Sequence, residues 1–152
     1  MSQKRSEKMY RIAGHVDREQ RQACRRMAEL RDALQQSEQQ LEVLHEYLQG
    51  YAADRNAPPG GSGKLSSAGQ LINYSAFLGQ LNQAVRQQQA HVDQARIAFD
   101  KQQERWKEVR TRSLALTQVA ERHAESERRR FAAAEQNQAD ELTLRRYLEA
   151  AG

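Results

Sequence analysis

The chain has few cysteines and prolines and no long apolar run. Its 152 residues include one cysteine, Cys24, so no disulfide can form within the chain. No apolar run approaches the length of a membrane span, and nothing in the first residues resembles a signal peptide. Both prolines stand together at 58–59, which leaves long stretches free of helix breakers. These absences exclude a disulfide scaffold and predict a soluble helical protein of a reducing cytoplasm.

What the chain does have is a seven-residue repeat in its second half. Residues 71–109 carry seam residues at alternating intervals of three and four. The apolar members are Leu71, Tyr74, Leu78, Leu81, Val85, Val92, Ala95, Phe99, Trp106 and Val109, and the polar members are Gln88 and Gln102. A repeat of this kind, kept over such a length, is typical of a coiled-coil seam and requires a partner helix.

A second series in the first half supplies that partner. Its members are Met9, Ala13, Val16, Gln20, Ala23, Met27, Leu30, Leu34, Ser37, Leu41, Leu44, Leu48 and Tyr51. The two series predict one helix over about residues 5–53 and another over about 68–149, with Ser67 and Gln70 at the spacing of a capping box. Residues 54–67 between them hold both prolines and three glycines, which predicts a flexible linker.

We therefore expect a single all-α domain over residues 1–152, an antiparallel two-helix coiled-coil hairpin whose second helix is the longer. Pairing of the same seams between two copies is the alternative. If Tyr51 faces Leu71, Gln20 falls opposite Gln102, where two amides can satisfy each other. In that register the first helix ends near Met9, opposite Ser113, and residues 114–152 extend beyond it. That extension is then either a solvated, partly frayed helix or a segment held inside another protein.

Charge separates along the expected hairpin. Residues 32–104 carry five Lys/Arg and eight Asp/Glu, a net charge of −3, and the other residues carry nineteen and twelve, a net charge of +7. A basic end where both termini meet favours nucleic acid, membrane headgroups or an acidic protein cavity. Acidic residues are interspersed, and aromatic residues do not alternate with the arginines as base stacking would require. No nucleic acid is therefore expected as a partner.

Motifs for catalysis, cofactors and metals are not convincing. Glu42 and His45 form one Glu-x-x-His unit, but a di-iron bundle needs a second unit and two more glutamates. Residues 60–66, GGSGKLS, resemble a phosphate-binding loop superficially, yet Pro58 and Leu65 stand where that motif needs Gly and Ser or Thr. We expect no catalytic, cofactor or metal site.

The segments on either side of the linker carry a resemblance. Leu41, Leu44, Tyr47 and Tyr51 follow a Leu-x-x-Leu-x-x-Tyr-x-x-x-Tyr pattern, and Asn73, Tyr74 and Phe77 follow Asn-Tyr-x-x-Phe. Both patterns are similar to the flagellar FliJ family, and the likeness in length and layout covers most of the chain. The resemblance implies a cytoplasmic, non-enzymatic stalk at the flagellar base, peripheral to the inner membrane. Such a stalk would insert into the hexameric export ATPase FliI, promote its assembly and activity, and contact the export gate FlhA and export chaperones.

Matching the motifs of that family assigns gate binding to Phe77, Leu81 and Ala84, with Gln88 where some relatives have His. Tyr47 and Phe77 are expected to be exposed near the linker. Combining the basic end with the resemblance, we expect ATPase contacts from arginines near the termini: Arg18, Arg21, Arg25, Arg110 and Arg112. The alternatives are the equivalent stalk of a virulence-type secretion system and a basic coiled coil that binds nucleic acid.

Overall fold

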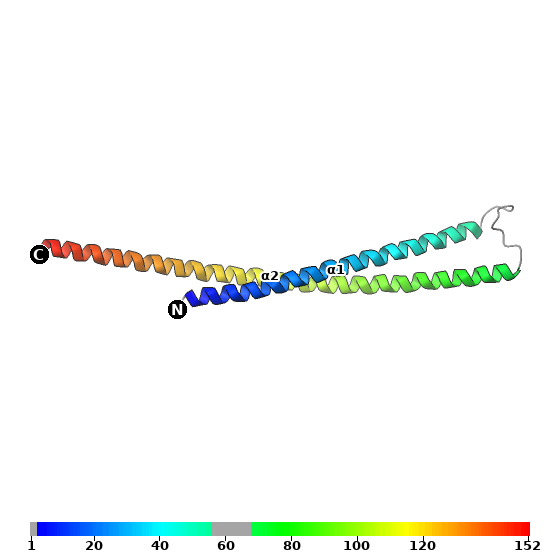
Figure 1. Ribbon diagram of the computed structural model, residues 1–152, viewed down its shortest axis with the longest axis horizontal. Helices are drawn as coiled ribbons and strands as arrows, with labels where there is room; N and C mark the ends of the chain where they lie inside the picture. Colours follow the sequence, from blue (N-terminus) through cyan, green and yellow to red (C-terminus); the bar gives the residue numbers. More distant parts are fainter. Residues whose placement is uncertain (1–2, 56–67) are drawn as a thin grey trace. The chain divides into compact units, whose positions relative to one another are not determined.

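The computed structural model describes residues 3–55 and 68–152, and these form two α-helices (Figure 1). Helix α1 spans Gln3–Arg55 and helix α2 spans Ala68–Ala151, 53 and 84 residues respectively. Both agree with the predicted ranges to within two residues, because proline and glycine are confined largely to the segment between them. The predicted linker at 54–67 lies, from residue 56 onward, outside the described residues. Within the described ranges, neither helix contains a segment apolar and long enough to cross a membrane.

Burial follows the two predicted series. On α1, every member from Met9 to Leu48 is buried or partly buried, and on α2 so is every member from Tyr74 to Val109. The members nearest the linker are more open, with Tyr51 36% and Leu71 47% exposed. One narrow stripe of each helix is thus withdrawn from water, as in a coiled coil. The predicted all-α hairpin, with the longer helix second, is confirmed.

The chain divides into two compact units, each containing part of both helices. The terminal unit comprises Met1–Ala23 and Trp106–Gly152, and the inner unit comprises Cys24–Arg105. The two units differ in the kinds of side chain that they bury between α1 and α2.

The terminal unit closes its seam with small residues. Its buried members are Ser6, Ala13, Val16, Ala23, Val109, Ser113 and Ala120. At the start of α1, the Ser6 hydroxyl donates to Glu127 Oε2 at 2.6 Å, and the Ser6 amide donates to Oε1 at 3.3 Å. Amides in the first turn of a helix lack intrahelical acceptors and favour negative charge nearby. The Glu127 carboxylate on α2 therefore caps the N-terminus of α1.

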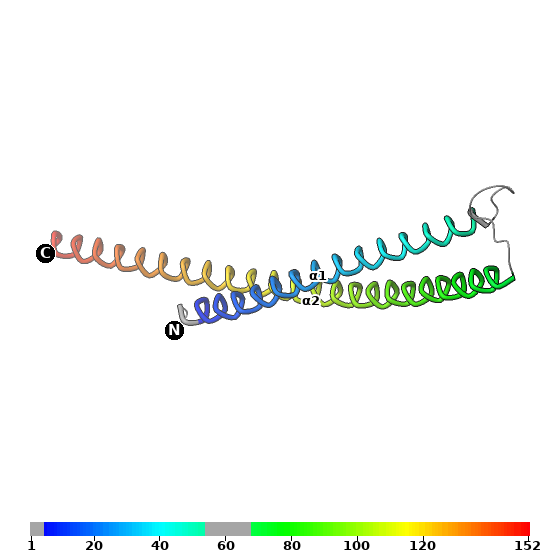
Figure 2. Tube along the Cα trace, turned by 45° about the vertical axis from the view of Figure 1, so that its right-hand side comes forward, coloured from blue at the N-terminus to red at the C-terminus, as the bar shows by residue number. Residues whose placement is uncertain are grey.

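The inner unit is more open. Of its described residues only Val92, 4% exposed, is a buried hydrophobic residue, and the seam leucines other than Leu71 are partly buried. Both views show α1 and α2 separating toward the linker (Figures 1 and 2). Polar contacts hold the two helices together: Gln88 donates to the Ser37 carbonyl at 3.0 Å and to Gln40 Oε1 at 3.2 Å.

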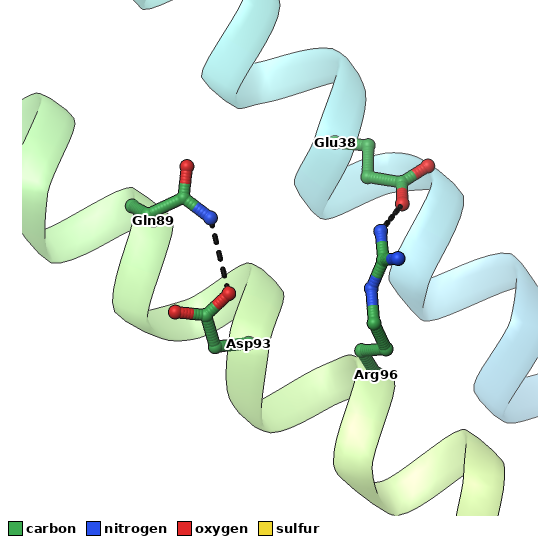
Figure 3. A network of polar contacts seen from close by, with 4 residues as sticks. All are labelled: Glu38, Gln89, Asp93 and Arg96. Atoms are coloured by element: carbon green, nitrogen blue, oxygen red, sulfur yellow. Dashed lines mark hydrogen bonds and ion pairs between the residues drawn. The ribbon is translucent and has the colours of Figure 1, made fainter.

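An ion pair also crosses the inner unit. Arg96 on α2 reaches Glu38 on α1 at 2.8 Å, while Gln89 donates to Asp93 along α2 at 3.1 Å (Figure 3). The residue numbers of the partners on α1 decrease as those on α2 increase, from Tyr51 with Tyr74 to Ser37 with Gln88. The two segments therefore run antiparallel.

The predicted register is wrong. It placed Tyr74 opposite Leu48, but the Tyr74 hydroxyl donates to the carbonyl of Tyr51. It also ended the first helix near Met9, opposite Ser113, whereas Ser6 contacts Glu127. These contacts, and those of Gln88 and Arg96, are displaced in one direction, by about one heptad on average. Hydrophobic patterning cannot detect such a slip, because every seam residue remains a seam residue. The register that would have paired Gln20 with Gln102 is not the one observed.

The extension of α2 is consequently shorter than predicted. Burial continues past residue 114, completely at Ala120 and partly as far as Glu127, and every residue from 128 to 152 is exposed. The added seam positions are Ser113, Leu116, Ala120, His123 and Glu127. Their four-and-three spacing was visible in the sequence, but apart from Leu116 their side chains are small or polar, so the hydrophobic signal was weak.

Candidate functional site

An aromatic cluster joins the two helices at the linker end of the inner unit. The rings of Tyr51 and Phe77 meet edge to face, with centroids 4.9 Å apart and planes at 73°. The Tyr74 hydroxyl adds its hydrogen bond to the Tyr51 carbonyl. Large rings can span the wider gap between diverging helices, and an edge-to-face pair contributes roughly 0.5–1.5 kcal/mol beyond area burial. Phe77 remains 41% exposed, so the cluster also presents an apolar surface to solvent.

The three predicted gate-binding residues lie along one stripe of α2. Phe77, Leu81 and Ala84 are four and three residues apart, which places them on one side of a helix. Phe77 is exposed, as predicted, whereas Leu81 and Ala84 are partly buried. Gln88, the next position of the stripe, is turned toward α1 by its hydrogen bonds to Ser37 and Gln40. Phe77 is thus the large apolar group that this stripe offers to a partner.

The second aromatic predicted to be exposed is also confirmed. Tyr47 on α1 is 57% exposed, and Val43, one turn earlier, is 47% exposed. Val43 was missed from the sequence, since it lies outside the seam series. Its position four residues before Tyr47 was the available signal.

The predicted ATPase-contact arginines are all exposed but do not belong to one unit. Arg18, Arg21, Arg110 and Arg112 lie in the terminal unit, and Arg25 lies in the inner unit. Arg21 Nε is 3.1 Å from Asp17, an exposed pair of the kind that contributes about 0–1 kcal/mol. The four of these arginines that lie in the terminal unit come from both helices, two from each.

Trp106 is a further feature of the terminal unit. The guanidinium of Arg110 lies 5.2 Å from the centroid of its ring, a cation–π contact. Among the described residues, the indole Nε1 of Trp106 is a buried donor with no hydrogen-bond partner. A large ring in a seam of small residues fills space but leaves its N–H without an acceptor, which costs stability.

Charge differs between the two units. The terminal unit contains fifteen Lys and Arg against eleven Asp and Glu, a net charge of +4. The inner unit contains nine of each, a net charge of zero. All of the chain's excess positive charge is therefore carried by the terminal unit. Such a surface attracts an acidic partner and repels a basic one.

Comparison with known proteins identifies the family. Residues 5–152 match the family model described as Flagellar FliJ protein. No curated protein and no solved structure matches the chain. The family match covers the aromatic cluster and both units, so it concerns the whole hairpin and not one motif. The chain belongs to the FliJ family of flagellar proteins, non-enzymatic components of the flagellar export apparatus.

Proposed function

We propose that this chain is the stalk of the flagellar export ATPase. The terminal unit enters the central hole of the hexameric ATPase FliI and promotes its assembly and activity. The inner unit links that ATPase to the export gate FlhA and to export chaperones. The protein then works in the cytoplasm, held at the inner membrane of the flagellar base through the gate. The observation that carries this proposal is the location of all excess positive charge in the terminal unit.

The exposed end of α2 supports the same role. Residues 128–151 are helical although no residue of the segment is buried. Contacts one turn apart stabilise α2 at the start of this segment and within it, including Arg129 with Glu125 at 2.8 Å and Gln136 with Asp140 at 3.2 Å. The exposed apolar side chains here are Phe131, Leu142, Leu144, Tyr147 and Leu148. A ring closing around the segment would cover these side chains and account for their presence on a helix surface.

ATP hydrolysis by FliI at fixed concentration tests the proposal. We expect stimulation by the native chain, together with ring formation, and a loss of at least half of the stimulation in Arg18→Glu/Arg110→Glu. The matched control is Arg31→Glu/Arg86→Glu, which reverses one exposed arginine on each helix of the inner unit. Circular dichroism verifies that both variants stay helical. Equal loss in the two variants would contradict the assignment of the ATPase contact to the terminal unit.

Binding to the gate gives the complementary test. Phe77→Ala should weaken affinity for the cytoplasmic domain of FlhA by about tenfold or more, because an exposed aromatic is a typical interface anchor. ATPase stimulation should remain. Tyr10→Ala, which removes a 47% exposed ring from the terminal unit, is the control and should leave gate affinity unchanged.

The alternative function, a coiled coil that binds nucleic acid, predicts a different pair of results. In that case affinity for nucleic acid would fall steeply with salt, and FliI would not be stimulated. That pair of results would overturn the stalk proposal.

A further inference from the structure

Helix α1 carries a second seven-residue stripe, one residue ahead of its seam. The stripe consists of Ala33, Gln36, Gln40, Val43, Tyr47 and Gly50, again at intervals of three and four. All six are exposed, whereas the adjacent seam residues Ser37, Leu41, Leu44 and Leu48 are partly buried. A helix with two adjacent stripes at this spacing can pack against two other helices. α2 covers the seam and leaves the second stripe exposed, although Gln40 Oε1 accepts a hydrogen bond from Gln88 of α2.

The stripe is hollowed along most of its length. One depression of about 440 Å³ is lined by Val43, Glu46, Tyr47, Gly50 and Tyr51. A second is lined by Gln36, Gln39, Gln40, Val43, Leu44 and, from α2, Gln88. Val43 lines both, so the two depressions adjoin along the stripe, and together they are called the groove below. At Gly50 a Cβ would meet no atom within 4 Å, so space for another side chain remains there.

The length of the groove suits a short helix. Residues 36–50 cover about 20 Å of α1, which corresponds to about four turns of a second helix packed alongside. Apolar anchoring is available from Val43, 47% exposed, and Tyr47, 57% exposed. At the other end, the exposed amides of Gln36 and Gln39 can hydrogen-bond polar side chains of a partner.

The charge beside the groove selects its occupant. No Lys or Arg occurs in α1 between Asp32 and Asp54. Asp32 and Glu46 are exposed and occupy the position directly before a stripe residue, where charges decide which helices pair. Two copies of this surface would repel each other, and a helix flanked by lysine or arginine would be attracted.

We propose that this groove, residues 36–51 of α1, binds an amphipathic helix of a partner protein, with apolar residues three and four apart and basic flanks. Its apolar residues pack on Val43 and Tyr47, and its basic residues face Asp32 and Glu46. The proposal depends on the groove and its charge. It does not require the stalk function proposed above.

A pair of synthetic helical peptides tests the charge rule. Both have leucine at heptad positions a and d; one has lysine and the other glutamate at e and g. Titration of the full-length chain, followed by fluorescence anisotropy, should show binding of the lysine peptide at least tenfold tighter than the glutamate peptide. The double variant Asp32→Lys/Glu46→Lys should reverse that preference. Equal affinities, or a preference that the double variant leaves unchanged, would overturn the proposal.

A pair of tyrosine variants tests the position. Tyr47→Ala should weaken the lysine peptide at least fivefold, and Tyr10→Ala, an exposed ring elsewhere on α1, should not. Equal effects would show that the peptide binds the chain without using the groove. Sedimentation of the chain alone completes the test, because self-association abolished by Tyr47→Ala would assign the groove to a second copy and overturn the proposed occupant. Stimulation of FliI by Tyr47→Ala, measured in parallel, reports on the stalk function separately.

Discussion

The terminal and inner units share the same seven-residue repeat but bury their seam residues to different depths. In the terminal unit the buried residues are Ala, Ser and Val, and Ala120 is 0% exposed. In the inner unit the seam is richer in leucine, yet its leucines stay partly exposed. Two helices alone can enclose small side chains, whereas long side chains hold the backbones apart and keep one flank in water. The inner unit therefore leaves part of its seam exposed to solvent, whereas the seam of the terminal unit is closed from Ser6 to Ala23 mainly by small side chains.

The largest difference in stability between the two units is expected when a seam alanine is enlarged. Ala120→Leu should lower the free energy of unfolding by about 1–3 kcal/mol, because the closed seam has no room for the added carbons. Ala95→Leu, at a partly buried seam position of the inner unit, should change it by less than about 0.5 kcal/mol. Thermal unfolding followed by circular dichroism measures both. Equal destabilisation would show that the inner seam is as tightly closed as the terminal one.

The second-largest effect is expected from the contact between Ser6 and Glu127 that caps the N-terminus of α1. A double-mutant cycle of Ser6→Ala and Glu127→Ala should give a coupling energy of about 1 kcal/mol, since a partly buried hydrogen bond to a charged group is lost. Glu125→Ala, two residues before Glu127, removes the exposed ion pair with Arg129; it is the control and should cost less than about 0.5 kcal/mol. Additive effects of the first two substitutions would mean that Glu127 does not stabilise the start of α1.

The aromatic contact of the inner unit should contribute less. A cycle of Tyr51→Ala and Phe77→Ala should give a coupling energy of about 0.5–1 kcal/mol, because both rings are partly solvated. Denaturation by urea measures it. A coupling near zero would mean that the rings meet without holding α1 and α2 together.

The smallest effect is expected at Arg96 and Glu38. Their side chains are 59% and 43% exposed, so Arg96→Gln should cost no more than about 0.5 kcal/mol. In about 1 M salt that cost should vanish, because screening weakens exposed pairs far more than partly buried ones. The Ser6–Glu127 coupling should persist under the same conditions. If high salt abolished both the cost of Arg96→Gln and the Ser6–Glu127 coupling energy, the two units would not differ in this respect.

Much of the candidate site could be predicted from sequence. The exposure of Tyr47 and Phe77 followed from their places beside filled seam positions, and the arginines near the termini were correctly expected at the surface. The groove on α1 could not be recognised, because half of its stripe is glutamine and alanine. Its openness depends on where α2 runs, which a single helix pattern does not specify.

The sequence by itself determined the two helices, their approximate ends, the seam of each and the excess of positive charge near the termini. These properties depend on local propensity and on a period of seven, both of which are written in the order of residues. Only the tertiary structure decided the register, the depth of burial and the length of the exposed end of α2. A slip of one heptad preserves every hydrophobic position, so the choice rests on particular contacts between the helices, such as those of Ser6 with Glu127 and Gln88 with Ser37.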